Sequence, residues 1–147
     1  MKLGRGPNLR LPLVSRKMKF SNQLIGLVDD EQVFHWIAQK FIEQINHGLE
    51  SVSLYDGSEA LDYLQKPESK IPDILFLDLN MPILNGWGFL DEFANLKARL
   101  TKKMDIYILS SSVDPEDHKK AKKYPYVKRF LSKPLTKNLI EDLLSKA

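Results

Sequence analysis

Five polar residues of this 147-residue chain follow short apolar runs, at or just past the points where β-strands would end. Three are carboxylic acids, one carries a hydroxyl and one carries an amine: Asp29, Asp30, Asp78, Ser110 and Lys133. The carboxyl ends of parallel strands meet at one edge of a sheet, so these side chains would converge there. The sequence therefore predicts an acidic pocket with one fixed cationic side chain.

Three carboxylates held within a few ångströms repel one another by roughly 4 kcal/mol per close pair at an effective dielectric of 20. A cation must balance that repulsion. Hard carboxylate oxygens without a nearby His or Cys favour Mg²⁺, which binds through one or two carboxylates and keeps several waters. Lys133 would supply a second, fixed positive charge.

A carboxylate beside a divalent cation and an amine suits attack on an incoming phosphoryl group. That transfer depends mainly on positioning and on neutralising the equatorial oxygens. Mg²⁺ and Lys133 would contact two of these oxygens, and Ser110 with a backbone amide after Asp78 would donate to the third. The five residues together predict phosphoryl transfer to a carboxylate.

The segments that must position these residues alternate between strand-length apolar runs and stretches of helical period, five times in all. The expected strands are 24–28, 51–55, 74–77, 106–109 and 126–131. The expected helices follow them near 34–45, 60–64 and 86–100, then from Pro115 onward, and finally near 139–144. Asp114 and Thr136 are the expected N-caps of the last two helices. On the first helix the expected apolar face is Phe34, Ile37, Ala38, Phe41 and Ile45.

The first, third and fourth strands are continuously apolar, as strands buried on both faces must be, whereas the second and fifth contain polar residues and suit sheet edges. These features predict an α/β fold with a doubly wound, five-stranded parallel sheet and helices on both faces. The strand order is the flavodoxin-like 2-1-3-4-5, whose ligand crevice lies outside the carboxyl ends of strands one and three.

The net charge of +3 is unevenly distributed along the chain. Residues 1–20 hold six basic residues and no acid, so residues 21–147 carry 16 basic against 19 acidic groups, about −3. We expect residues 1–20 to be a disordered basic extension or an expression remnant, with a nucleic-acid or partner-binding arm as the alternative. Residues 21–147 form the predicted domain. The absence of cysteine and of any membrane-length apolar stretch suits a cytoplasmic location.

Four segments, correctly ordered and spaced, resemble the signatures of bacterial response-regulator receiver domains, the CheY-like domains of two-component signal transduction. They are Val28-Asp29-Asp30-Glu31, Leu77-Asp78-Leu79-Asn80-Met81-Pro82 with Asn85-Gly86, Leu109-Ser110, and Lys133-Pro134-Leu135. The resemblance covers residues 24–146. It departs from the common pattern before the last strand, where Lys122-Lys123-Tyr124-Pro125-Tyr126 replaces the usual Ala and Gly.

The resemblance implies a role for each residue of the pocket. Asp78 would be the phosphoacceptor, and Lys133 would pair with the phosphoryl group. Asp30 would be a direct Mg²⁺ ligand, Asp29 a ligand mainly through water, and the Asn80 backbone carbonyl a further ligand. Ser110 would be the hydroxyl that moves toward phosphate, and Phe130 the aromatic switch residue that turns inward with it. It also implies a cis peptide bond between Lys133 and Pro134.

The family further implies that side chains two residues past the phosphoacceptor and two past the switch serine flank the path of the hydrolytic water. Here they are Asn80 and Ser112, both small and neutral. We therefore expect an aspartyl phosphate that decays by itself within minutes. The protein would be a phosphoacceptor switch and not an enzyme beyond self-phosphorylation and autodephosphorylation.

The expected phosphodonor is a sensor histidine kinase or a histidine phosphotransfer protein. Only Lys146 and Ala147 follow the last helix, so we expect a stand-alone, single-domain regulator without a DNA-binding domain or membrane contact. A downstream protein would then bind the face formed by the fourth helix, fifth strand and fifth helix. That face carries a basic cluster, which is otherwise simply solvated: Lys119, Lys120, Lys122, Lys123, Lys128 and Arg129.

Two other functions share parts of this pattern. A phosphatase of the haloacid dehalogenase type needs a second Asp two residues after the nucleophile, where this chain has Asn80. A pseudo-receiver would keep the fold without being phosphorylated, but the intact Asp30, Asp78 and Lys133 argue against it. Nucleotide binding is disfavoured because the sequence has no Gly-rich phosphate-binding loop. Outside the pocket, we expect solvated histidines, His35, His47 and His118, and packing tryptophans, Trp36 and Trp87.

Overall fold

The computed structural model describes residues 23–46 and 48–146, so the extension expected over residues 1–20 lies outside the described residues. Strands and helices alternate along the described chain. They are β1 (Leu24–Val28), α2 (Gln32–Ile45), β2 (Glu50–Leu54), α3 (Gly57–Gln65), β3 (Ile74–Leu77), α4 (Gly86–Leu96), the 3₁₀ turn η1 (Lys97–Arg99), β4 (Asp105–Ser110), α5 (Pro115–Ala121), β5 (Val127–Ser132) and α6 (Lys137–Lys146).

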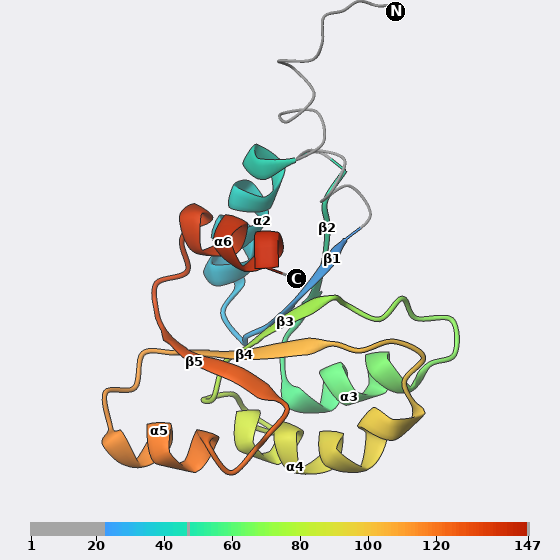
Figure 1. Cartoon of the computed structure of the whole chain (residues 1–147), viewed down its shortest axis with the longest axis vertical. Helices are drawn as coiled ribbons and strands as arrows, with labels where there is room; N and C mark the ends of the chain where they lie inside the picture. Colours follow the sequence, from blue (N-terminus) through green and yellow to red (C-terminus); the bar gives the residue numbers. More distant parts are fainter. Residues whose placement is uncertain (1–22, 47, 147) are drawn as a thin grey trace, which may run out of the picture.

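The five strands form one parallel sheet in the order β2-β1-β3-β4-β5, which confirms the predicted topology. Every residue of β1 and β3 is buried, whereas the edge strands β2 and β5 have one buried residue each and are otherwise exposed or half-buried. Helices α2 and α6 cover one face and α3, α4 and α5 cover the other (Figure 1). Strands β1 and β3, where the winding reverses, are hydrogen-bonded neighbours at the centre.

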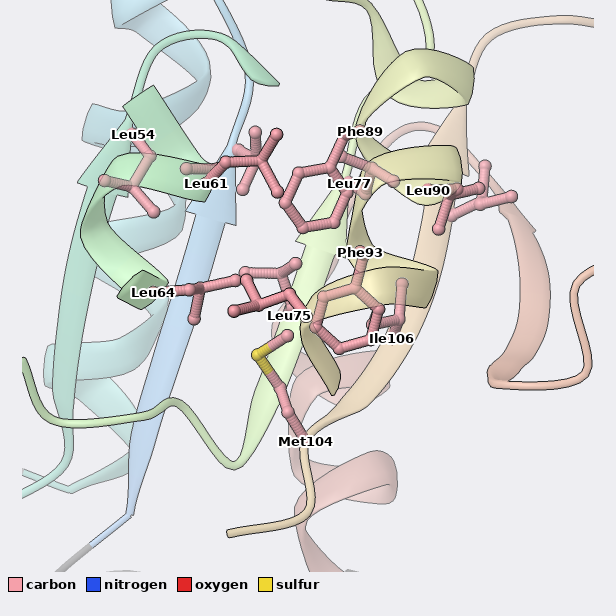
Figure 2. Close-up of a cluster of buried hydrophobic side chains, with 14 of the residues drawn as sticks. Leu54, Leu61, Leu64, Leu75, Leu77, Phe89, Leu90, Phe93, Met104 and Ile106 are labelled. Atoms are coloured by element: carbon pink, nitrogen blue, oxygen red, sulfur yellow. The ribbon is translucent and has the colours of Figure 1, made fainter. Parts of the chain in front are cut away.

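Successive residues of β3 point into two separate apolar cores, because strand side chains alternate between faces. Leu75 and Leu77 pack with α3 and α4, as Figure 2 shows, and Ile74 and Phe76 pack with α2 and α6. Full burial of a leucine or phenylalanine side chain contributes about 1.5–3 kcal/mol. The two cores therefore fix the central strands, and with them the strand ends that carry the acidic residues.

Helix starts at the carboxyl edge are capped by side chains that accept backbone N–H groups. Asp56 caps α3, Asn85 caps α4 and Asp114 caps α5, and Thr136 Oγ1 accepts from the Leu139 N–H at the start of α6. The caps predicted at Asp114 and Thr136 are confirmed. Each such cap contributes typically about 1 kcal/mol to helix stability.

Glycine at position 86 lets α4 begin directly against the end of β3. A Cβ there would lie 2.6 Å from the Asp78 carbonyl oxygen and 2.9 Å from the Leu79 Cα, which is closer than side chains approach backbone. The Gly86 N–H donates to the Leu79 carbonyl at 3.0 Å. The loop after Asp78 is therefore short, tight and fixed to the helix that follows it.

Strand boundaries differ from the predicted ones by one residue at several ends. β2 starts at Glu50, because its register with β1 pairs Leu24 with Glu50, and β4 extends to Ser110, which pairs with Ser132 of β5. None of the described helices is both long and apolar enough to cross a bilayer.

Candidate functional site

Three carboxylates from two strand ends meet at the carboxyl edge of the sheet, as predicted. One oxygen each of Asp29, Asp30 and Asp78 can be chosen so that all three lie within 4.8 Å of one another. Their surroundings differ, since Asp29 is 1% and Asp78 is 7% exposed, while Asp30 faces solvent. The group thus consists of two buried carboxylates and one exposed carboxylate.

Asp29 is held at both of its carboxylate oxygens and at its backbone. Its Oδ1 accepts the Glu31 N–H at 2.9 Å and its Oδ2 accepts from the Lys133 Nζ at 2.8 Å. Its own N–H donates to the Leu54 carbonyl at 3.1 Å. The first carboxylate is therefore already in place when a ligand arrives, and its Oδ1 replaces a side-chain cap at the start of α2.

The Asp78 carboxyl lies in an environment that disfavours its ionised form. Burial, followed by the charge of Asp29, raises the pKa of Asp78 to about 6, with Lys133 and the backbone N–H of Asn80 opposing the rise and Asp30 adding to it. Its backbone N–H donates to the Val28 carbonyl at 2.9 Å, which ties the ends of β1 and β3 together. A cation beside this carboxylate would restore its usual acidity.

Lys133 reaches both buried carboxylates from the loop after β5. Its Nζ lies 2.8 Å from Asp29 Oδ2 and 3.7 Å from Asp78 Oδ1. Burial alone would lower the pKa of Lys133, but its hydrogen bond to Asp29 and the charges of Asp29 and Asp78 outweigh that effect and raise the pKa. The peptide bond to Pro134 is cis, as predicted.

Ser110 lies fully buried at the end of β4 and is connected to α5 through Ser112. Its Oγ accepts the Ser112 N–H at 3.1 Å. The Ser112 hydroxyl in turn donates to Asp117 Oδ2 at 2.5 Å and accepts the Asp114 N–H at 3.2 Å. A displacement of the Ser110 hydroxyl would therefore disturb the start of α5 directly.

Phe130 of β5 is half-buried, and its ring stacks on His118 of α5 with a centroid separation of 3.9 Å and an interplanar angle of 28°. His118 is exposed, as predicted, but its ring packs on one side against this aromatic. The residue expected to act as the aromatic switch is thus in contact with the helix that Ser110 also contacts through Ser112.

The unusual segment between α5 and β5 attaches to α4. The Tyr124 hydroxyl donates to Asp91 Oδ1 at 2.7 Å, the Tyr126 hydroxyl donates to the Leu90 carbonyl, and the Tyr124 ring stacks on Trp87 at 5.9 Å. Burial and the bond to Asp91 raise the pKa of Tyr124 to about 12. Trp87 is half-buried in this cluster, so its predicted packing role is confirmed.

Two predictions about α2 are wrong. His35 is fully buried and not solvated, and Trp36 is 61% exposed and not packed. The fully buried residues of α2 are His35, Ala38 and Ile42. The expected apolar face is confirmed except at one position, since Ala38 is buried and Phe34, Phe41 and Ile45 pack half-buried against the same core, whereas Ile37 is 48% exposed. His47 lies outside the described residues.

Five large apolar side chains are exposed among the described residues. Three of them follow pocket residues by three positions each: Val33 after Asp30, Ile83 after Asn80, and Val113 after Ser110. With Trp36 and Ile37 they complete the set of large exposed apolar side chains in the described residues. Val33 and Ile37 line one surface hollow together with Lys133.

The donor set fits a hard divalent cation. Three carboxylate oxygens within 4.8 Å form a ligand group, found among the described residues, that contains no Cys or His, and they match the preference of Mg²⁺ for a few carboxylates plus water. Asp30 and Asn80 are exposed, which leaves room for those waters. The six basic residues predicted around α5 and β5 are also all exposed.

Known proteins resemble this chain along most of its length. Residues 25–145 match the family described as the response regulator receiver domain. The crystal structure of a two component response regulator from Cytophaga hutchinsonii superposes with a TM-score of 0.71 at 30% identity, covering 84% of this chain and 95% of that one.

Two curated relatives are also similar in sequence. The probable methanogenesis regulatory protein FilR2 of Methanothrix harundinacea is 27% identical over 123 residues, which are 82% of this chain and 76% of that protein. A protein-glutamate methylesterase/protein-glutamine glutaminase of Treponema pallidum is 32% identical over 98 residues, which are 64% of this chain. The chain spans only 22% of that second protein's length.

Proposed function

The chain belongs to the family of response regulator receiver domains, and from this premise we propose that it is a phosphoacceptor switch of a two-component phosphorelay. The observation that carries the proposal is the convergence of Asp29, Asp30 and Lys133 on the buried Asp78. A buried carboxylate without neighbouring charges would be protonated and therefore a poor nucleophile. Asp78 instead has a cation, Lys133, and two further carboxylates, Asp29 and Asp30, around it.

In the proposed reaction, an Asp78 carboxylate oxygen forms a bond to phosphorus while the bond from phosphorus to the donor's leaving atom breaks. Lys133, already 3.7 Å from Asp78 Oδ1, would neutralise one equatorial oxygen of the phosphoryl group. The Asn80 N–H, which now hydrogen-bonds the Asp78 carboxylate, would donate to another. Positioned charges and donors of this kind account for most of the catalysis of phosphoryl transfer.

Asp29, Asp30, Asp78 and the Asn80 carbonyl would hold Mg²⁺, with Asp30 the most direct ligand and Asp29 acting mainly through water. When bound, Mg²⁺ would neutralise the buried carboxylates and the developing charge on the phosphoryl oxygens. The proximity of the three carboxylates supports this assignment, because nothing else in the described pocket except Lys133 balances their charge.

The proposed donor is a protein that carries a phosphohistidine, such as a sensor histidine kinase or a histidine phosphotransfer protein. The exposed apolar side chains of Val33 and Ile37, which line a surface hollow with Lys133, support a protein donor over a small molecule alone.

After phosphorylation, we propose that the Ser110 hydroxyl leaves the Ser112 N–H to donate to the phosphoryl group, and that Phe130 turns inward. Both movements would act on α5, which Ser110 contacts through Ser112 and Phe130 contacts through His118. A downstream protein would then bind the exposed basic face of α5, β5 and α6. The phosphoryl group would be lost by autodephosphorylation.

The proposal is tested by incubating the protein with acetyl phosphate and Mg²⁺ and separating the products on a phosphate-affinity gel. The native protein should acquire a slowly migrating, acid-stable and base-labile form, and Asp78→Asn should not. Asp62→Asn, which removes an exposed carboxylate of α3, is the matched control and should be labelled normally. Equal labelling of Asp78→Asn, or no labelling of the native protein, would contradict the assignment and favour a binding module without phosphorylation.

A further inference from the structure

One buried titratable side chain beside the pocket has no part in the proposed reaction. His35, on the first turn of α2, is 0% exposed, and its Nε2 lies 2.7 Å from the backbone carbonyl oxygen of Asp29. A carbonyl oxygen can only accept, so Nε2 carries the hydrogen and donates it. The contact joins α2 to the residue that begins the acidic pocket.

The surroundings of the His35 ring fix its orientation. The Tyr55 ring packs on it with a centroid separation of 4.3 Å, and Phe34 meets it edge-on at 5.6 Å. Tyr55 is itself held, since its hydroxyl donates to Gln32 Oε1 at 3.0 Å and its N–H donates to Glu59 Oε1 at 2.7 Å. The His35 Nδ1 is buried without a partner among the described residues, so the bond to Asp29 is the polar contact that this ring makes there.

Asp29 has four polar groups, and each one is engaged by a different residue. Its N–H bonds β2 through Leu54, its carboxylate oxygens bond Glu31 and Lys133, and its carbonyl bonds His35. Because Asp29 is 1% exposed, water cannot easily replace a lost bond. Without the His35 donor, the peptide unit that joins Asp29 to Asp30 would have to rotate to satisfy its carbonyl.

We infer that His35 is a positioning residue of the acidic pocket, one that fixes the Asp29-Asp30 peptide so that both carboxylates face Asp78. This role rests on the proposed phosphoacceptor function, and His35 itself touches neither metal nor phosphate. It extends the site by one residue that comes from the buried face of α2. Outer-shell partners of metal ligands act in the same way, by orienting groups that the metal then contacts.

Two substitutions separate the hydrogen bond from the volume of the ring. His35→Leu fills the space with an apolar side chain and removes the donor. His35→Gln places an amide nitrogen near the position of Nε2, so it keeps the donor. Ile42→Ala, on the same face of α2 and 3% exposed in the native protein, is the control for a general loss of helix stability.

The experiment measures Mg²⁺ binding by titration calorimetry and the Mg²⁺ dependence of labelling by acetyl phosphate, below the melting temperature of every variant. We expect His35→Leu to weaken Mg²⁺ binding and raise the Mg²⁺ concentration for half-maximal labelling, each by about tenfold. His35→Gln should recover most of this loss, and Ile42→Ala should lower the melting temperature without changing either quantity.

The possible results distinguish this role from the proposed function. Unchanged Mg²⁺ dependence in His35→Leu, with normal labelling of the native protein, would overturn the role of His35 and leave the phosphoacceptor proposal intact. An equal loss in Ile42→Ala, or no rescue by His35→Gln, would also overturn it. Weakened Mg²⁺ binding in His35→Leu together with no labelling of any protein would support His35 and contradict the phosphoacceptor.

Discussion

Helices α4 and α5 follow the neighbouring strands β3 and β4, and each begins just past a residue of the acidic pocket. In α4, five of 11 residues are buried, and Gly86 places its first turn against the backbone of Asp78. In α5, Ala121 is the one buried residue of seven. One helix is fixed by apolar burial and the other presents nearly all of its surface to solvent.

Helix α5 is held by the buried Ala121, by the stacking of His118 on Phe130 and by side-chain contacts near its two ends. Ser112 bonds Asp117 at the start, and Lys120 lies over the Trp87 ring, 4.6 Å from its centroid, near the end. Bonds of this kind contribute about 0.5–1.5 kcal/mol each and can be exchanged for water or another partner. The difference suits the proposed switch, in which the proposed phosphoacceptor Asp78 stays in place while the helix after Ser110 moves.

The largest expected effect concerns α4, the helix that is fixed by apolar burial. Phe93 of α4 is 2% exposed and packs between Phe89 and Tyr126. Phe93→Ala should lower the free energy of unfolding by about 3–5 kcal/mol, as truncation of a buried aromatic does. Lys119→Ala in α5 is the comparison and should change it by less than about 0.5 kcal/mol. Urea denaturation measures both, and similar losses would show that α5 is as firmly packed as α4.

The second effect concerns the electrostatic cost of Asp78. The pKa of Asp78 is raised from 3.8 to about 6 in the folded protein, so the folded state binds a proton at Asp78 more tightly than the unfolded state does. Metal-free native protein should therefore lose stability as the pH rises from about 4 to about 6, up to about 1–3 kcal/mol.

Asp78→Asn removes this cost, so above pH 6.5 and without metal it should melt at a higher temperature than the native protein. Mg²⁺ should raise the melting temperature of the native protein and have a smaller effect on the variant. A metal-free variant that melts lower than the native protein at pH 7.5 would mean that the Asp78 charge is not destabilising.

A smaller effect is expected where α5 begins. Ser112→Ala removes the hydroxyl that bonds Asp117 and accepts the Asp114 N–H, and should cost about 1 kcal/mol. Hydrogen exchange of the α5 amides should become faster, while exchange in α4 stays unchanged. Faster exchange in both helices would contradict the independence of the two helices.

The sheet, its helices and the convergence of the acidic residues at its carboxyl edge could be predicted from the sequence. The alternation of apolar runs and helical periods indicates a parallel sheet covered by helices, and the continuously apolar strands mark its centre. The burial of His35 could not, since His35 interrupts the apolar stripe and the buried face of α2 depends on Tyr55 of a distant segment. The spacing of His35, Ala38 and Ile42 places them on one face of the helix and could have indicated that His35 is buried. The face that contains Phe34 and Ile37 is more apolar, so the sequence favoured that face instead.

The contacts near Ser110 and Phe130 could not be predicted from the sequence either. The bond from Ser112 to Asp117 and the stacking of Phe130 on His118 join segments whose spacing depends on side-chain rotamers. The attachment of Tyr124 to α4 also depends on the path of the segment before β5, whose sequence departs from the family pattern. Sequence reasoning thus located the strand ends but not the side-chain bonds between neighbouring loops.

The smallest expected effect concerns the lifetime of the phosphoryl group. Asn80 lies in the loop fixed to α4 and Ser112 in the loop before α5, and both would flank the hydrolytic water. Asn80→Arg should slow the loss of phosphate by about threefold, under about 1 kcal/mol on the barrier, because its bulk stays in the path. Ser112→Tyr should also slow the loss, but less, because its loop can move aside. Phosphate loss is followed after removal of the donor, and unchanged rates in both variants would contradict this account of the water path.

The measurement that tests the central proposal most directly is chemical mapping of the phosphoryl group. Protein treated with acetyl phosphate is reduced with borohydride, which converts an aspartyl phosphate to homoserine, and its peptides are then sequenced by mass spectrometry. The account predicts homoserine at position 78 in samples with Mg²⁺, and none at position 78 when Mg²⁺ is chelated. Homoserine at position 29 or 30, or conversion at position 78 that does not depend on Mg²⁺, would contradict it.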